Sequence, residues 1–161
     1  MRISEIVSNF KESLNYNAPT TWTNRGNDHM GTLTVDGVDY FIHVEIDMKL
    51  NFKVGEVSFG VIVNGTPSYN LVGDTTNSMK VFGAIGNAMT TKVIQESCDI
   101  VTFVAVDNEE SRMPVYRRIA RKLARRSNFG SFKEITLPDG SSMVAVFNKD
   151  IEGIDQFLAS V

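Results

Sequence analysis

Hydrophobic positions change their spacing along the chain. In residues 2–15 they recur every three or four positions, which predicts an amphipathic helix. From Trp22 to Val63 they alternate with polar residues in "GTLTV", "DYFIHVEIDM" and "EVSFGVIV", and glycine-containing turns separate these runs. The first third of the sequence therefore predicts a helix followed by an antiparallel meander of three or four strands.

The rest of the chain alternates between helical and strand patterns. Residues 64–77, "NGTPSYNLVGDTTN", are rich in turn residues and predict a loop, and residues 78–97 predict a helix. "DIVTFVAV" is an uninterrupted apolar run, typical of a strand buried on both faces. A second helix over 111–126, a hairpin in "FKEITLPDGSSMVAVF" and a short helix in "IEGIDQFLAS" complete the order. We expect a single α+β domain, residues 1–161, with a mostly antiparallel central sheet.

Charge is distributed unevenly. The chain has a net charge of −3, yet residues 111–126 contain no acidic side chain. Their seven basic residues are Arg112, Arg117, Arg118, Arg121, Lys122, Arg125 and Arg126. Three interpretations stay open: an exposed helix face, an anion site for a cofactor phosphate held by Ser111 and Arg112, or a surface for a nucleic acid or an acidic protein.

The apolar residues of the same segment form one stripe at helical spacing. They are Val115, Tyr116, Ile119, Ala120, Leu123 and Ala124. Pro114 is compatible with the first turn of a helix, and Ser111 is the expected N-cap, with Asp107 or Asn108 as alternatives.

The order of elements over residues 22–147 resembles the core of the GNAT superfamily of N-acetyltransferases. The strand-to-helix junction "VAVDNEESRMPVYRRIA" carries the likeness, with Asn108 and Tyr116 at the positions of the polar residue and the tyrosine of that family. The resemblance implies acetyl-CoA as cofactor, an amine as substrate, and Tyr116 as the acid that protonates the leaving thiolate. It implies a cofactor site at Val72, Gly73, Thr75, Thr76, Asn77, Ser78, Asn108, Ser111 and Arg112.

A narrower resemblance points to a viral protein. "KVFGAIGNAM" together with "VTFVAVDNEESRMPVYRRIARKLAR" is similar to small bacteriophage proteins of uncharacterised role. The glycine-rich pyrophosphate signature of GNAT enzymes, Gln/Arg-x-x-Gly-x-Gly/Ala, is absent before residue 78. The alternative is therefore a catalytically inactive binding protein that turns its basic helix toward an acidic host protein or a nucleic acid.

Glu45 and Glu56 in the meander are the candidates for a general base, with His43 as a third. "HVEID" places His43, Glu45 and Asp47 on one face of a strand, but such neighbours lie about 7 Å apart, too far for one metal shell. With two His and a single cysteine, Cys98, we expect neither a metal site nor an internal disulfide. No apolar run approaches the roughly 20 residues of a membrane-spanning helix. Because a chain with one cysteine forms no internal disulfide, we expect a reducing compartment and a cytoplasmic protein, in the host cytoplasm if phage-encoded.

Overall fold

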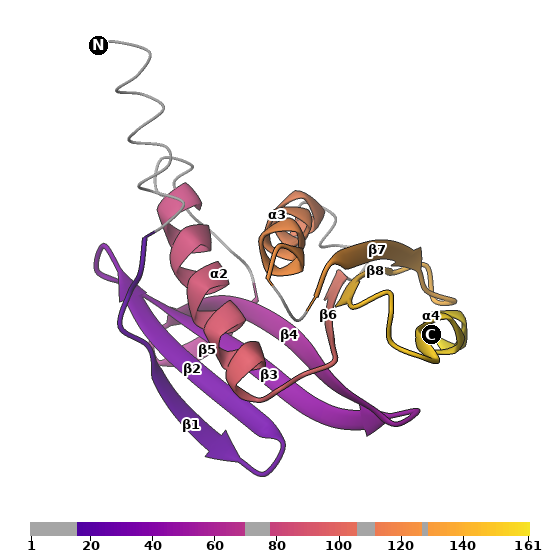
Figure 1. Cartoon of the computed structure of the whole chain (residues 1–161). Coiled ribbons are helices and arrows are strands. Elements are labelled where there is room, and N and C mark those ends of the chain that lie inside the picture. Colours follow the sequence, from indigo (N-terminus) through magenta and orange to yellow (C-terminus); the bar gives the residue numbers. More distant parts are fainter. Residues whose placement is uncertain (1–15, 70–77, 106–111, 127–128) are drawn as a thin grey trace. The chain divides into compact units, whose positions relative to one another are not determined.

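The computed structural model describes residues 16–69, 78–105, 112–126 and 129–161 (Figure 1). This part of the chain has an α+β structure with a mixed, mostly antiparallel sheet of eight strands in the order β1-β2-β3-β4-β6-β8-β7, with β5 paired to β4. The strands are β1 (Thr21–Arg25), β2 (Asp28–Val35), β3 (Val38–Lys49), β4 (Phe52–Val63), β5 (Thr66–Ser68), β6 (Ile100–Ala105), β7 (Ser131–Thr136) and β8 (Ser142–Phe147). The helices are α2 (Ser78–Gln95), α3 (Met113–Ala124) and α4 (Ile154–Ser160).

The strand and helix predictions are confirmed wherever the structure describes the chain. The meander is present as β1 to β4, and the apolar run is strand β6. One difference lies in the expected loop, where Thr66–Ser68 pair with β4 as the short strand β5. Asn64 and Gly65 both have positive φ, 51° and 76°, so they form a tight hairpin turn that returns the chain along β4. The expected helix at 2–15 and the rest of the loop lie outside the described residues.

Two compact units divide the chain, Met1–His43 with Phe59–Thr91 and Val44–Ser58 with Lys92–Val161. In the first unit, α2 packs on one face of the meander, where Phe59 of β4 meets Phe82 edge to face at 6.4 Å. Alternate residues such as Leu33 and Val35 of β2 are buried, whereas their neighbours Thr32 and Thr34 are exposed. This alternation leaves one polar face on the strands.

The second unit is built on a parallel pair. Val54–Val57 of β4 pair in parallel with Ile100–Phe103 of β6, and the antiparallel strands β8 and β7 follow. Residues of β4, β6 and β8 form a buried cluster with Ile154 and Phe157 of α4. Phe103, which points to the other face of β6, stacks on Tyr116 of α3. Helices α3 and α4 therefore cover opposite faces of the β6–β8 sheet.

None of the described helices is long and apolar enough to cross a membrane.

Candidate functional site on helix α3

Helix α3 is the next described element after the buried strand β6. Its N-cap residue is Arg112, one position after the expected Ser111, and Arg112 makes no side-chain capping hydrogen bond. Pro114 stands in the first turn, where its missing N–H costs nothing. The side chain of Arg112 is buried, with 6% of its surface exposed. A buried cation thus marks the start of this helix.

The apolar stripe of α3 holds the helix on the sheet. Its buried residues are Met113, Tyr116, Ile119, Ala120 and Leu123. The ring of Tyr116 lies 5.5 Å from that of Phe103, with an angle of 29° between the ring planes. Only 1% of Tyr116 is exposed, so this residue is part of the hydrophobic core as well as a candidate acid.

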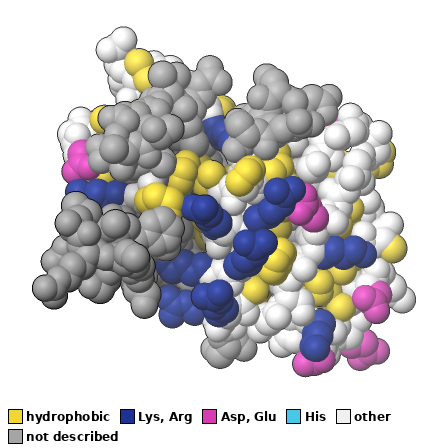
Figure 2. Space-filling model, turned by 90° about the horizontal axis from the view of Figure 1, so that it is seen from above, with side chains coloured by type: hydrophobic (Ala, Val, Ile, Leu, Met, Phe, Trp, Pro, Cys, Tyr) yellow, Lys and Arg dark blue, Asp and Glu magenta, His cyan; other side chains and the backbone are white. Residues whose placement is uncertain are grey.

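The opposite side of α3 is basic. Arg118, Arg121, Arg125 and Arg126 are exposed, and Arg117 and Lys122 are half-buried at the margins of the stripe. Figure 2 shows Lys and Arg side chains gathered with hydrophobic side chains between them on the face where α3 lies. We call the six basic residues of this segment the basic surface: Arg117, Arg118, Arg121, Lys122, Arg125 and Arg126.

Positive charges on the basic surface repel one another. Arg121 lies three residues after Arg118 and four before Arg125, and like charges at these spacings destabilise a helix by about 0.2–0.5 kcal/mol per pair. Burial, and secondly the charge of Arg126, lower the pKa of Lys122 below its usual value. A bound anion would relieve this repulsion.

One acidic residue compensates part of this charge. Glu134 of β7 accepts two hydrogen bonds from Arg117, with an Nη2–Oε1 distance of 2.7 Å and an Nε–Oε2 distance of 2.9 Å. The contact lowers the pKa of Glu134 and raises that of Arg117. Arg121, Arg125 and Arg126 form no ion pair with any described residue. The charges of these three arginines are therefore not balanced by any residue that the structure describes.

Glu134 could not be placed beside α3 from the sequence. No acidic residue occurs between Ser111 and Lys133, and Glu134 belongs to the strand after the helix. Only the pairing of β7 with β8 and the packing of α3 on that hairpin bring its carboxylate to Arg117.

Most of the candidate cofactor residues lie outside the described residues: Val72, Gly73, Thr75, Thr76, Asn77, Asn108 and Ser111. Ser78 is the first residue of α2. Glu45 and Glu56 are exposed on β3 and β4. Glu56 is paired in register with Thr102 of β6. Thr102 lies on the same face of the sheet as Ile100, which packs against α4. Glu56 therefore lies on the opposite side of the sheet from Tyr116.

The expected histidine candidate has a different neighbour. Nε2 of His43 lies 2.9 Å from Oδ1 of Asp28 on β2, which gives His43 a carboxylate partner outside the "HVEID" run. Among the residues that the structure describes, no three His, Cys, Asp or Glu side chains are grouped as a metal site would need.

The chain was also compared with protein-family models, with curated proteins and with solved structures, and none of them matches. The proposals that follow therefore rest on the sequence and the geometry alone.

Proposed function

We propose that the protein is a binding protein that uses the basic surface of α3 against a polyanionic partner. The supporting observation is that Arg121, Arg125 and Arg126 are exposed and form no ion pair with the part of the chain that the structure describes, in a segment, residues 111–126, without acidic residues. A guanidinium group binds a phosphate or a carboxylate through two parallel hydrogen bonds, so a row of them suits a surface of repeated anions.

Two kinds of partner fit this surface, a nucleic acid and an acidic host protein. The basic residues of α3 are five arginines and one lysine, counted over 117–126, and guanidinium is the better match for phosphate geometry. The helix has 12 residues and is about 18 Å long, so it would contact several phosphates of one strand. A nucleic acid would show a steep salt dependence that follows the number of phosphates contacted.

The test is a double variant with a matched control. Arg121→Gln with Arg125→Gln removes two charges from the basic surface, and Arg25→Gln with Lys49→Gln removes two exposed charges from β1 and β3. We expect the first variant to lose at least about tenfold in affinity for a labelled oligonucleotide, and its salt slope to fall by about 2. Equal losses in both variants would contradict the proposal. Binding of polyglutamate in preference to the oligonucleotide would identify the acidic protein as the partner class.

A second candidate is an acetyl-CoA-dependent N-acetyltransferase acting on an amine. The strand order favours it, because a parallel pair β4–β6 follows a meander and is itself followed by α3 and the β7–β8 hairpin, as in the GNAT core. Buried Arg112 at the start of α3, one turn before Tyr116, is compatible with a cofactor phosphate near that end of the helix. Because folds host many functions, the topology alone does not assign the activity.

Calorimetric titration with acetyl-CoA tests this candidate. We expect saturable binding that Arg112→Ala weakens and Arg125→Ala leaves within about twofold. Since Arg112 is buried, circular dichroism must show that its variant is folded. No binding at about millimolar cofactor by the folded wild-type protein would contradict the enzyme hypothesis.

A further inference from the structure

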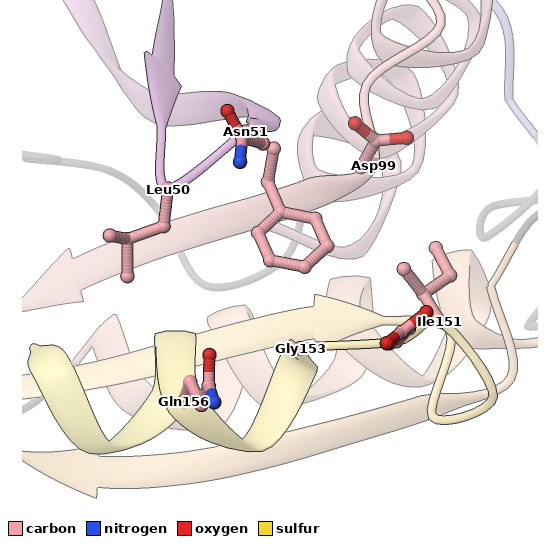
Figure 3. Close-up of a pocket in the computed structure, with 8 residues that line it drawn as sticks. Leu50, Asn51, Asp99, Ile151, Gly153 and Gln156 are labelled. Atoms are coloured by element: carbon pink, nitrogen blue, oxygen red, sulfur yellow. The ribbon is translucent and has the colours of Figure 1, made fainter.

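A pocket of about 360 Å³ lies in the second unit, on the side of the sheet that carries α4 (Figure 3). Three segments form it: the turn between β3 and β4, the residue before β6, and the turn that leads into α4. Its lining includes the side chains of Asn51, Phe52, Asp99, Ile151, Glu152 and Gln156. Figure 3 shows Asn51 and Asp99 across the pocket from Gln156 of α4. The volume is within the range of small-molecule sites.

The floor of the pocket is apolar and fixed. Phe52 is buried, with 7% of its surface exposed, and its ring packs edge to face on Phe157 at 5.9 Å. Ile151, which packs against the same core cluster, adds a second apolar wall. A short alkyl chain would find both dispersion contacts and an aromatic ring here, and an aromatic ring also attracts a cation.

The carboxylate of Asp99 is held in place by the backbone. The N–H of Lys53 donates to Oδ2 of Asp99 at 2.8 Å, and the N–H of Asp99 donates to the carbonyl of Lys53 at 2.8 Å. Oδ1 of Asp99 accepts no hydrogen bond from the described residues. The group is therefore oriented without being neutralised, which leaves one anionic oxygen for a ligand.

Both charged side chains of the lining are carboxylates, Asp99 and Glu152. Glu152, which is exposed, forms no ion pair with the described residues and adds a second carboxylate. The amides of Asn51 and Gln156 offer carbonyl oxygens, and no Lys or Arg lines the pocket. The pocket on the polar face of the first unit differs, because Arg25 lines it and His43 already pairs with Asp28 there.

The two-residue turn at the rim places a leucine in a backbone conformation that is unusual for this residue. Leu50 and Asn51 have φ of 50° and 67°, in the left-handed region, and Leu50 is 58% exposed. Asparagine is common in that region, but leucine is not. The turn therefore presents an apolar side chain to solvent beside the pocket.

From this geometry we propose that the pocket binds the cationic end of an organic amine: an ammonium or guanidinium group on a short alkyl chain. The cation meets Asp99 and Glu152, the amide oxygens of Asn51 and Gln156 accept its remaining hydrogens, and the alkyl part lies on Phe52 and Ile151. The charge of the ligand is thus opposite to that of the polyanion proposed for α3, and the pocket lies on the other face of the β6–β8 sheet. The two proposals can fail separately.

The ligand could be a free amine or the side chain of a lysine or arginine in a peptide. Two probes separate these sources, n-butylguanidine and the capped peptide Gly-Arg-Gly, with n-butanol as the neutral analogue. Binding is measured by the shifts of the backbone amide resonances of residues 51 and 151–156 in isotope-labelled full-length protein. We expect dissociation constants on the order of 1 mM for n-butylguanidine and no saturable shift with n-butanol. Tighter binding of the peptide would identify a protein segment as the source, and tighter binding of n-butylguanidine a free amine.

Asp99→Asn is the decisive variant, because an amide oxygen still accepts from the Lys53 N–H. We expect it to weaken n-butylguanidine binding at least about fivefold, and Glu152→Gln, an exposed change that leaves the core intact, to weaken it about two- to fivefold. Asp155→Asn, on α4 but outside the lining, makes the same charge change and should alter affinity less than about twofold. Binding of n-butanol as tight as that of n-butylguanidine, or unchanged affinity in both pocket variants, would overturn the proposal.

Discussion

The guanidinium of Arg117 lies alongside the carboxylate of Glu134, so that two hydrogen bonds of 2.7 and 2.9 Å join α3 to β7. This contact distinguishes Arg117 from Arg121, Arg125 and Arg126. The charge of Arg117 is balanced by a residue of the protein, whereas Arg121, Arg125 and Arg126 have no such partner among the described residues. For the polyanion proposed as partner, Glu134 would therefore compete for Arg117 at this end of the basic surface.

Glu134→Gln should therefore strengthen polyanion binding. The variant frees Arg117 for the partner, and we expect about a two- to threefold gain in affinity and a salt slope that grows by up to about 1. Asp155→Asn is the control, since it adds the same net charge on α4, across the sheet from α3. Anisotropy titrations at several salt concentrations measure both quantities. Equal gains in the two variants would show that net charge, not the release of Arg117, is responsible.

The turn between β7 and β8 should make stability depend on pH. Asp139 accepts hydrogen bonds from the hydroxyl and the N–H of Ser141, at 2.5 and 2.9 Å, and these lower the pKa of its carboxyl below the usual value. Because the folded-state pKa is depressed, the contribution to stability is present above the unfolded pKa of about 3.9 and disappears as the pH falls through the lower folded value. We expect Asp139→Ala to melt below the wild type at pH 7, and the gap to narrow as the pH falls below about 3.9 and then through the lower folded-state pKa. A gap that persists there would exclude this ionisation as its cause.

Cys98 should be nearly inert in the native protein. It is 6% exposed, and burial, the largest cause, raises the pKa of its thiol to about 11. At pH 8 only about 0.1% of the thiol would be ionised, and the thiolate is the reactive species. We expect labelling by a thiol reagent to be slow for the folded protein and fast in denaturant. Fast labelling without denaturant would show that the segment between α2 and β6 opens readily.

Tyr116 combines two roles that two substitutions can separate. Tyr116→Ala removes a ring stacked on Phe103 and should cost about 3–5 kcal/mol of unfolding free energy. Tyr116→Phe keeps the ring, so we expect a cost of about 1 kcal/mol or less from the lost hydroxyl. If the protein is an acetyltransferase, Tyr116→Phe would nevertheless lower kcat by about 100-fold or more. Denaturant melts and turnover assays of the same samples separate the two effects, and unchanged kcat in Tyr116→Phe would exclude the acid role.

The sequence predicts secondary structure well here because each element carries its own local signal. Period-two alternation predicts the strands of the meander, and the apolar stripe from Val115 to Ala124 predicts the buried side of α3, although Val115 and Ala124 are only half-buried and the buried Met113 is not part of it. The N-cap was placed one residue early, because Ser111 is a better capping residue by type than Arg112, which in fact occupies that position without capping. The preference of a residue type for the N-cap is an average over many helices, whereas the packing of this helix decides where it begins.

The candidate sites were less predictable because they depend on contacts distant in sequence. Asp99 and Lys53 are 46 positions apart, and only the parallel pairing of β4 with β6 brings them together. The lining of the pocket beside α4 likewise comes from three separate segments that carry no common motif. The density of basic residues, by contrast, is visible in the sequence, and it predicts the basic surface on α3.

Gly31 should be needed for the position of the single tryptophan. Thr21 to Arg25 of β1 pair with β2, and Gly31 stands opposite Trp22. A Cβ atom at Gly31 would lie 3.0 Å from the indole ring, closer than such contacts normally are, so Gly31→Ala must displace the ring. Because β1 is an edge strand, the ring would move toward solvent, and we expect a red-shifted fluorescence maximum with a loss of about 1–3 kcal/mol in unfolding free energy.

The fluorescence of this variant reports Trp22 alone, since the chain has no other tryptophan. Gly130→Ala is the matched control, because a Cβ there meets nothing within 4 Å, and it should leave both quantities unchanged. An unshifted maximum in Gly31→Ala would mean that the indole does not rest on Gly31 in solution.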